Sequence, residues 1–288
     1  MGLFFRNYDK PGPGVKKDEP PKRGFFRFFD IFTRKFGHFV RANLLYSLFL
    51  IPTYLIIMAL MYFIFGGIIG MNLQESIPNI GIIVVVFSLI FANFYVSIIG
   101  AGPATAGITY IMRNFANEQH AWIWSDFKDT LKSNLKQSLI FFFIDILIFA
   151  IMYITIVEYI NIGGTIALGR YFLYIFGVVI MLMHLYVYPM MITFKLSVKN
   201  IIKNSLIFTL AYLPLNLLIA IILVAVHIGI PVAIILIGGN YYALFLAIYF
   251  LAEIFVLQTF SSFMVNFMVY PKIKKHMLDV AEKETKKD

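Results

Sequence analysis

Six long runs of apolar residues constrain this chain more than any other feature, because each is long enough to cross a membrane as a helix. The hydrocarbon core of a bilayer is about 30 Å thick and needs about 20 helical residues. The runs cover residues 42–69, 80–112, 138–158, 171–194, 206–236 and 241–269. Charged residues make up only 14% of the chain, against about 25% in a soluble domain. The sequence therefore predicts an all-α, six-span transmembrane helical bundle.

The second run is too long for one straight span, and it contains a stretch rich in glycine and alanine at residues 100–107. Small residues allow helix backbones to approach closely in a membrane, and Pro103, which lacks an N–H, suits the first turn of a helix. We therefore expect a helix that breaks near Gly100 and restarts at Pro103. The predicted helix-crossing residues are Gly100, Gly102, Pro103, Thr105 and Gly107. The fifth run contains Gly229 and Pro231, so a break or a partly interfacial position is an alternative there.

Arginine and lysine are distributed asymmetrically along the chain. Of the 24, 23 lie in the segments 1–41, 113–136, 195–203 and 272–288, and Arg170 is the exception. The positive-inside rule then places the N- and C-termini in the cytoplasm and the protein in the plasma membrane. The same rule accounts for the net charge of +9 without nucleic acid as a partner.

The N-terminal part divides into two predicted segments. Residues 1–23 are polar and rich in proline and glycine, which predicts a flexible cytoplasmic arm. Residues 24–41 place six phenylalanines at helical spacing on one side and basic residues largely on the other, which predicts an amphipathic helix. This helix either lies on an anionic leaflet or docks under the bundle or on a partner. The transmembrane domain then covers 42–270, and a basic cytoplasmic tail covers 271–288.

A weak internal repeat suggests how the spans are arranged. A Ser-Leu pair precedes or opens the first, third and fifth spans, and a proline marks the exit from the even-numbered ones. The pairs begin at Ser47, Ser138 and Ser205, and the prolines are Pro103, Pro189 and Pro271. The pattern predicts three helical hairpins in a parallel repeat. The alternative is a generic leading sequence that recurs without a true repeat.

The segment between the second and third spans is the most distinctive polar part of the chain. It holds both tryptophans, which either anchor the protein at the membrane interface or form a docking surface. The candidate partner-contact residues are Arg113, Trp122, Trp124, Asp126 and Phe127.

Three ionisable residues lie inside the apolar runs, and such residues are expensive in a membrane and functional by default. Asp145 comes nine residues after Lys136, and thus about 13 Å into the span. His184 and Glu253 lie near the middle of the fourth and sixth runs. With Asn93 they form a candidate intramembrane polar site, in which either carboxyl group pairs with protonated His184 or carries a proton itself. The alternative is a neutral carboxyl hydrogen-bonded to an amide or tyrosine for structural reasons.

Enzymatic and metal chemistry finds little support in the sequence. The chain has no cysteine, which excludes disulfides and thiolate catalysis. Its five histidines form no HxxxH or HExxH pair, and no phosphate-binding or nucleophile-elbow motif occurs. We therefore expect a protein that is not an enzyme, with no cofactor and no metal.

Residues 100–140 resemble the YesL-like family of bacterial membrane proteins, which carry a domain of unknown function. The resemblance rests on Gly102-Pro103-Ala104-Thr105-Ala106-Gly107, Arg113, Asp126-Phe127 and Asn134-Leu135-Lys136-Gln137. Segments 2–4 and 24–43 also look like that family. Its members are encoded beside carbohydrate ABC importers in Gram-positive bacteria, so the resemblance implies a role alongside sugar uptake. It implies no catalytic residues.

Three functions are expected from these features. The leading one is a non-enzymatic accessory or regulatory subunit of a carbohydrate ABC importer, which contacts permease and ATPase subunits through residues 24–41 and 113–137. The second is a stand-alone small-solute transporter or channel that uses Asp145, His184 and Glu253. The third is a lipid-binding membrane protein that uses the phenylalanine-rich helix.

Overall fold

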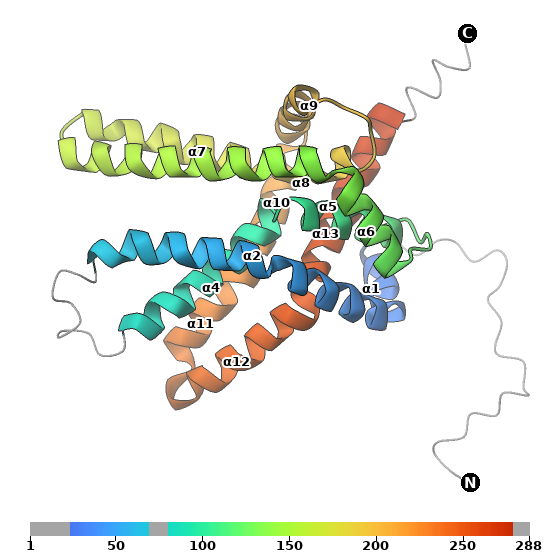
Figure 1. The fold of residues 1–288 in the computed structure, drawn as a ribbon, viewed down its shortest axis with the longest axis horizontal. Helices are drawn as coiled ribbons and strands as arrows, with labels where there is room; N and C mark the ends of the chain where they lie inside the picture. The colour runs from blue at the N-terminus through green and yellow to red at the C-terminus, as the bar shows by residue number, and fades with distance from the viewer. Residues whose placement is uncertain (1–23, 69–79, 279–288) are drawn as a thin grey trace, which may run out of the picture.

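The computed structural model describes residues 24–68 and 80–278 (Figure 1). All regular secondary structure within these ranges is helical. Six of its helical segments are long and apolar enough to cross a membrane: Phe36–Phe63, Gly81–Ile98, Leu135–Ile162, Ile166–Met191, Leu213–Ile237 and Gly239–Leu278. The prediction of an all-α bundle with six potential spans is confirmed.

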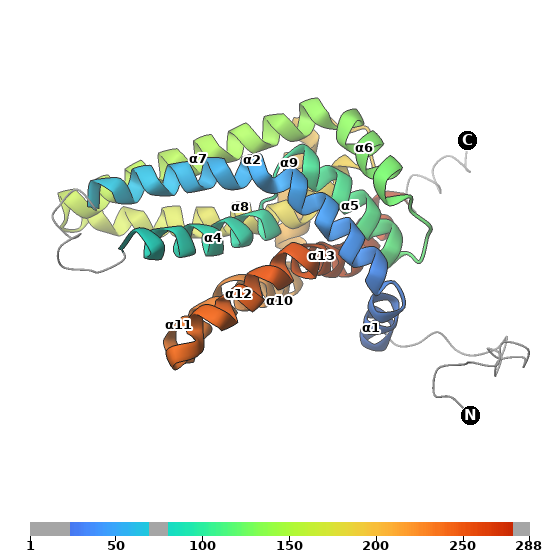
Figure 2. The same cartoon turned by 60° about the horizontal axis from the view of Figure 1, so that its bottom comes forward.

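The long helices form three hairpins. The first pairs α2 (Phe36–Ile68) with α4 (Ile80–Ile98), and the second pairs α7 (Leu135–Ile162) with α8 (Gly169–Met191). In the third, α10 (Leu213–Val224) and α11 (Ile230–Ile237) lead to α12 (Tyr242–Ala252) and α13 (Gln258–Ile273). Short 3₁₀ turns, η2 (Ile166–Leu168) and η4 (Gly239–Tyr241), lie at the tips of the second and third hairpins. All three hairpins extend toward the same side of the molecule, as the predicted parallel repeat requires (Figures 1 and 2).

The opposite end carries the shorter helices α1 (Gly24–Arg34) and α6 (Ile123–Ser133) (Figure 2). A further short helix, α9 (Val198–Ala211), packs against α8 and leads into the third hairpin. Most of the basic residues of the described ranges lie on or next to these three helices. The long helices instead expose apolar side chains such as Phe63 and Ile237, which are more than 80% exposed. Such an apolar surface suits contact with lipid.

The helix break predicted at Gly100–Pro103 is present. Helix α4 ends at Ile98, and α5 (Pro103–Ala116) begins after a sharp turn. Gly100 and Gly102 adopt φ values of 97° and 62°, a left-handed region that glycine enters without steric cost. Ten of the residues of α5 are buried, and it packs against α6, α8, α13 and α2. The restarted half-helix is therefore the centre of the fold.

Gly107 brings α6 against α5. A Cβ atom at this position would lie 2.8 Å from Phe127 Cδ2 and 3.0 Å from the Phe127 carbonyl oxygen. Phe127 is fully buried and also packs on Phe49 of α2. The absence of a side chain at Gly107 thus allows three helices to meet.

The fifth span does not contain the break that was the alternative there. Residues Ala225–Gly229 form one π turn, η3, and Pro231 follows in the first turn of α11, where its missing N–H is tolerated. The span is therefore continuous. A second π turn, η5 (Glu253–Leu257), joins α12 to α13 in the sixth span. Single π turns inside α-helices are often found at functional sites.

The predicted helix over 24–41 divides at Lys35, because α1 ends at Arg34 and residues 36–41 belong to α2. Phe28 and Ile31 of α1 are buried, and Phe28 contacts Phe260, Phe263 and Phe267 of α13. One face of α1 thus docks under the bundle. At the N-terminal end of α1, Phe25 and Phe26 are exposed.

Helix α13 continues past the boundary predicted between residues 270 and 271, to Ile273, and a π turn, η6 (Lys274–Leu278), extends it. Pro271 lies inside this helix. The arm predicted at 1–23 and the end of the tail at 279–288 lie outside the described residues.

Candidate functional site

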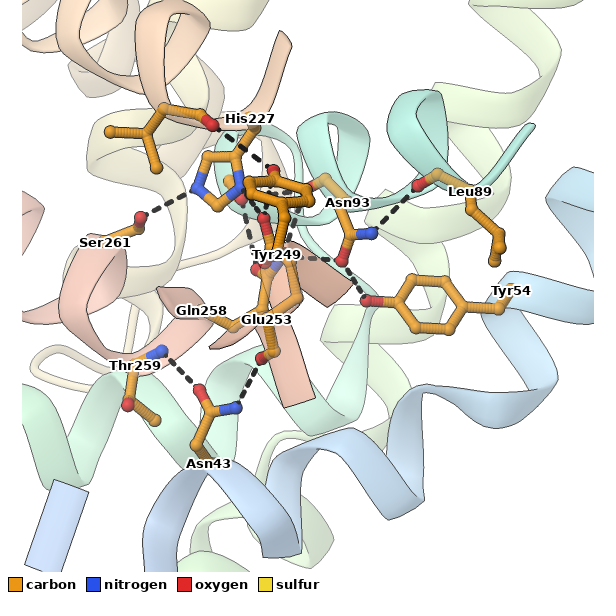
Figure 3. Close-up of polar contacts among 12 residues, drawn as sticks. Asn43, Tyr54, Leu89, Asn93, His227, Tyr249, Glu253, Gln258, Thr259 and Ser261 are labelled. Carbon is orange, nitrogen blue, oxygen red and sulfur yellow. Dashed lines mark hydrogen bonds and ion pairs between the residues drawn. The ribbon is translucent and has the colours of Figure 1, made fainter. Parts of the chain in front are cut away.

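Glu253 is the hub of a buried hydrogen-bond network (Figure 3). It opens the π turn η5 and is only 3% exposed. Its Oε1 lies 2.8 Å from His227 Nδ1 and accepts a 2.5 Å hydrogen bond from the Tyr249 hydroxyl. Its Oε2 accepts a 3.0 Å hydrogen bond from Gln258 Nε2. Two donors and an imidazole nitrogen therefore surround one carboxyl group inside the bundle.

His227 lies on the other π turn, η3, and is fully buried. Its second ring nitrogen, Nε2, lies 2.8 Å from Ser261 Oγ. The ring thus bridges Glu253 and Ser261 and links the two halves of the third hairpin. We refer to Glu253 and His227 as the deep pair.

Asn43 of α2 holds the π turn on which Glu253 sits. Its Nδ2 donates to the carbonyl oxygens of Glu253 and Ile254, each at 2.7 Å, and its Oδ1 accepts from the Thr259 N–H at 2.7 Å. A π turn disturbs the regular backbone ladder, and buried backbone groups need partners. The fully buried Asn43 amide supplies them from the neighbouring helix.

Asn93 of α4 connects the deep pair to the first hairpin. Its Nδ2 donates to the Leu89 carbonyl oxygen, so its Oδ1 must face its other neighbours. That oxygen accepts from the Tyr54 hydroxyl at 2.8 Å and from Gln258 Nε2 at 3.2 Å. Gln258 Oε1 in turn accepts from the Ser97 hydroxyl. The network therefore joins side chains of four spans.

A second buried pair joins the second hairpin. His184 Nε2 of α8 lies 3.0 Å from Asp145 Oδ2 of α7, and both residues are no more than 6% exposed. The other ring nitrogen, Nδ1, lies 2.9 Å from the Ile180 carbonyl oxygen. We refer to Asp145 and His184 as the hairpin pair.

A cavity of about 40 Å³ lies beside the helix break and is lined by residues of α2, α4, α5, α8 and α13. His184 lines it from the hairpin pair, and Gln258, which binds Glu253, lines it from the deep pair. The Oδ1 atom of Asn266, another lining residue, is buried without a partner in the described part of the chain. A cavity of this volume has room for a few water molecules next to these polar groups, and it is far below the 300–1,000 Å³ of a typical small-molecule pocket.

The helix break forms one wall of this cavity. The Gly102 N–H donates to the Tyr188 hydroxyl at 3.1 Å, and the Ala101 N–H donates to Thr105 Oγ1. A Cβ atom on Gly100 would lie 2.6 Å from Tyr188 Cε2. Glycine is therefore needed where α4 turns past α8 into α5.

The structure brings some of the predicted polar residues together and separates others. Asp145 lies with His184, and Asn93 lies in the network of Glu253. His184 and Glu253 do not bond to each other, so they belong to two linked clusters rather than to one contact. Sequence reasoning missed His227, Asn43 and Tyr249. His227 lies in a continuously apolar run, which was the signal that it is buried in a span. Gly229 and Pro231, which follow it closely, favoured a break at this point instead.

The candidate partner-contact residues have two different environments. Trp122 and Trp124 are 69% and 57% exposed at the start of α6. Asp126 accepts a hydrogen bond from the Trp122 N–H and so holds that helix terminus.

Phe127 and Arg113 instead make contacts inside the protein. Phe127 is fully buried. The Arg113 guanidinium donates to Thr193 Oγ1 and Asn114 Oδ1 and lies over the rings of Tyr110 and Tyr270. Only the tryptophans of this set present a substantial free surface.

Ion pairs fasten α1 to the turn after α5. Glu118 accepts hydrogen bonds from Arg34 at 2.7 Å and from Arg27 at 2.9 Å. The hydrogen bond from Arg34 lowers the pKa of the Glu118 carboxyl, partial burial opposes this, and Arg27 adds to the lowering. Burial lowers the pKa of Lys35, with a further contribution from Arg34. Lys35 Nζ donates to the Gln119 carbonyl oxygen and lies 4.4 Å from the centre of the Phe115 ring.

Across residues 24–68 and 80–278, no three side chains of the His, Cys, Asp and Glu types gather as metal ligands would. The two pairs each supply one imidazole and one carboxyl group, a combination that suits proton exchange.

A profile of the family described as "Protein of unknown function, DUF624" matches residues 80–156. The match covers α4, the helix break, α5, α6 and most of α7, and so includes Asp145 but not His184, His227 or Glu253. No curated protein and no solved structure matches the chain. The matched region overlaps the residues that resemble the YesL-like family, and that resemblance stays a prediction.

Proposed function

We propose that this protein is a stand-alone membrane transporter or channel that moves protons through the polar core between its hairpins. The observation that supports this proposal is the buried Glu253–His227 pair, which Gln258 connects to a cavity with room for a few water molecules. Buried ionisable groups are costly in a membrane and are retained at ion and proton pathways. We also propose that the protein lies in the plasma membrane with both termini in the cytoplasm, as the distribution of lysine and arginine predicts.

Both pairs lie inside segments long and apolar enough to cross a membrane. The cavity volume favours water and protons over a sugar in this conformation.

Proton flux into proteoliposomes tests the proposal. Purified protein is reconstituted with a trapped pH-sensitive dye, and an imposed pH gradient is followed with valinomycin present to compensate charge. We expect the wild type to dissipate the gradient faster than empty vesicles and Glu253→Gln to lose this flux. Glu158→Gln, an exposed carboxyl on α7, is the matched control and should retain it. Equal rates for the wild type, Glu253→Gln and empty vesicles would refute the proposal.

A second candidate is an accessory subunit of a carbohydrate ABC importer, as the YesL-like resemblance implies. The exposed tryptophans on α6 favour it, since Trp122 and Trp124 lie at the basic end, where an ATPase would approach. Affinity purification from native membranes should then recover permease and ATPase subunits with the wild type and fewer with the double variant Trp122→Ala/Trp124→Ala. Tyr241→Ala, exposed at a hairpin tip, is the control. Recovery of the protein alone would reject this candidate.

A third candidate, lipid binding through α1, is supported by the exposed Phe25 and Phe26. Deletion of α1 should then weaken binding to anionic vesicles.

A further inference from the structure

His227 occupies a position in which both of its ring nitrogens keep a partner in either protonation state. Nδ1 faces Glu253 Oε1 and Nε2 faces the Ser261 hydroxyl, each at 2.8 Å. A hydroxyl group can donate or accept. Neutral His227 therefore donates from Nδ1 and accepts from Ser261, whereas protonated His227 donates from both nitrogens after the hydroxyl rotates.

Glu253 is arranged to remain a carboxylate beside this ring. The chain of hydrogen bonds begins at the Leu89 carbonyl oxygen, which can only accept and so orients the Asn93 amide. Asn93 Oδ1 then faces Gln258 Nε2, which directs an N–H toward Glu253 Oε2. Tyr249 donates to the other oxygen. While Glu253 is ionised it can accept from all three neighbours, and protonated His227 keeps a partner at both ring nitrogens, so an added proton is accommodated on His227 without loss of a hydrogen bond.

The hairpin pair differs in its hydrogen-bond chemistry. The Ile180 carbonyl oxygen next to His184 Nδ1 can only accept, so Nδ1 must carry a hydrogen. The 3.0 Å contact between Nε2 and Asp145 Oδ2 then requires a proton between them, on one atom or the other. Without this proton, the lone pair of His184 Nε2 would face the Asp145 carboxylate. If the ring hydrogen moved to Nε2, the lone pair of Nδ1 would face the Ile180 carbonyl oxygen instead. Loss of this proton therefore breaks a contact in a buried site.

Other groups around the two pairs are uncharged phenols, amides and hydroxyls. Tyr54 of α2 and Tyr249 of α12 face the deep pair, with Asn93, Gln258 and Ser261. Tyr95 of α4 and Tyr188 of α8 are the titratable groups near Asp145. Within the described residues, no lysine or arginine bonds to either pair. The protonation of each pair is therefore governed mainly by its own hydrogen bonds.

We infer that His227 is the side chain that gains and loses a proton in the core, whereas the Asp145–His184 pair keeps its proton throughout. This inference rests on the proposed function because it names the proton carrier of that site. Ser261 is a positioning residue, since it supports both forms of His227 through the rotation of its hydroxyl group.

Nitrogen NMR of the full-length protein in lipid nanodiscs tests the inference without any transport measurement. The protein is labelled with ¹⁵N-histidine, and spectra are recorded from pH 5 to pH 9. The resonances of His38, His120 and His276 are assigned from single His→Asn variants. The two remaining signals belong to His184 and His227. Either His184→Asn or His227→Asn identifies both of them, so only one of these two variants has to fold.

We expect the His227 nitrogens to change between the singly and doubly protonated forms across this range, while those of His184 stay constant. Ser261→Ala should disturb the His227 resonances at both ends of the range, and Ser205→Ala, a buried serine on α9, should not. A His184 signal that titrates, or a His227 signal that does not, would overturn the inference. If His227 titrates but the vesicles show no proton flux, the inference stands and the proposed function fails.

Discussion

Asn43 should be among the most important single side chains for the stability of the fold. Its amide makes three hydrogen bonds of 2.7 Å to backbone groups around η5, and it is fully buried. Asn43→Leu removes these hydrogen bonds and keeps a side chain of similar size. It leaves the carbonyl groups of Glu253 and Ile254 and the Thr259 N–H to find other partners.

The expected loss follows from those three groups. Hydrogen bonds between membrane helices average about 0.6 kcal/mol, which gives about 2 kcal/mol for three as a lower value. A buried polar group left without a partner costs about 1–3 kcal/mol. Because the π turn can relax toward regular α-helix and re-pair some groups, we expect a total loss of about 2–4 kcal/mol in the free energy of unfolding.

Unfolding in mixed micelles of dodecyl maltoside and SDS, followed by tryptophan fluorescence, measures this loss. Asn266→Leu is the matched control, because Asn266 is also a buried amide, its Oδ1 is unpartnered, and its Nδ2 bonds only within its own helix. The control should cost less than about 1 kcal/mol. Equal losses in the two variants would refute the assignment of Asn43 as the support of the π turn.

Two further predictions concern the basic end of the molecule. Gly107→Ala places a Cβ atom 2.8 Å from Phe127 Cδ2 and should destabilise the protein by about 1–3 kcal/mol in the same unfolding assay, whereas Gly37→Ala, with open space around it, should not. Glu118→Gln should loosen α1 while costing no more than about 1 kcal/mol, because the ion pairs are substantially exposed. Since the pKa of Glu118 is lowered in the folded protein, the wild-type contact is fully present above the unfolded value and is lost as pH falls through the folded value. The mobility of a spin label at Phe25→Cys would report this release, and the label attaches at one site because the chain has no other cysteine. A label whose mobility is the same at pH 7 and pH 3 would contradict the prediction.

The spans and the helix break could be predicted because local chemistry determines them. A run of about 20 apolar residues dictates a membrane helix whatever it packs against. Gly100, Gly102 and Pro103 dictate a turn through their backbone preferences alone. The same reasoning placed Asp145, His184 and Glu253 inside spans.

The pairing of these residues could not be predicted, because it depends on contacts between distant helices. Glu253 bonds to His227 across 26 residues, and Asn43 reaches Glu253 across 210. The π turn η5 was also not predictable, since its backbone groups bond to Asn43 of a distant helix. The burial of Phe127 similarly depends on the missing side chain of Gly107.

The most direct test of the central claim, that the polar core takes up protons from water, is charge displacement after a pH jump on a solid-supported membrane. This transient current reports proton binding even when no steady transport occurs. The account predicts a displacement in the wild type and in Glu158→Gln, and none above that of empty vesicles in Glu253→Gln or His227→Asn. Equal displacements in all four proteins would contradict it.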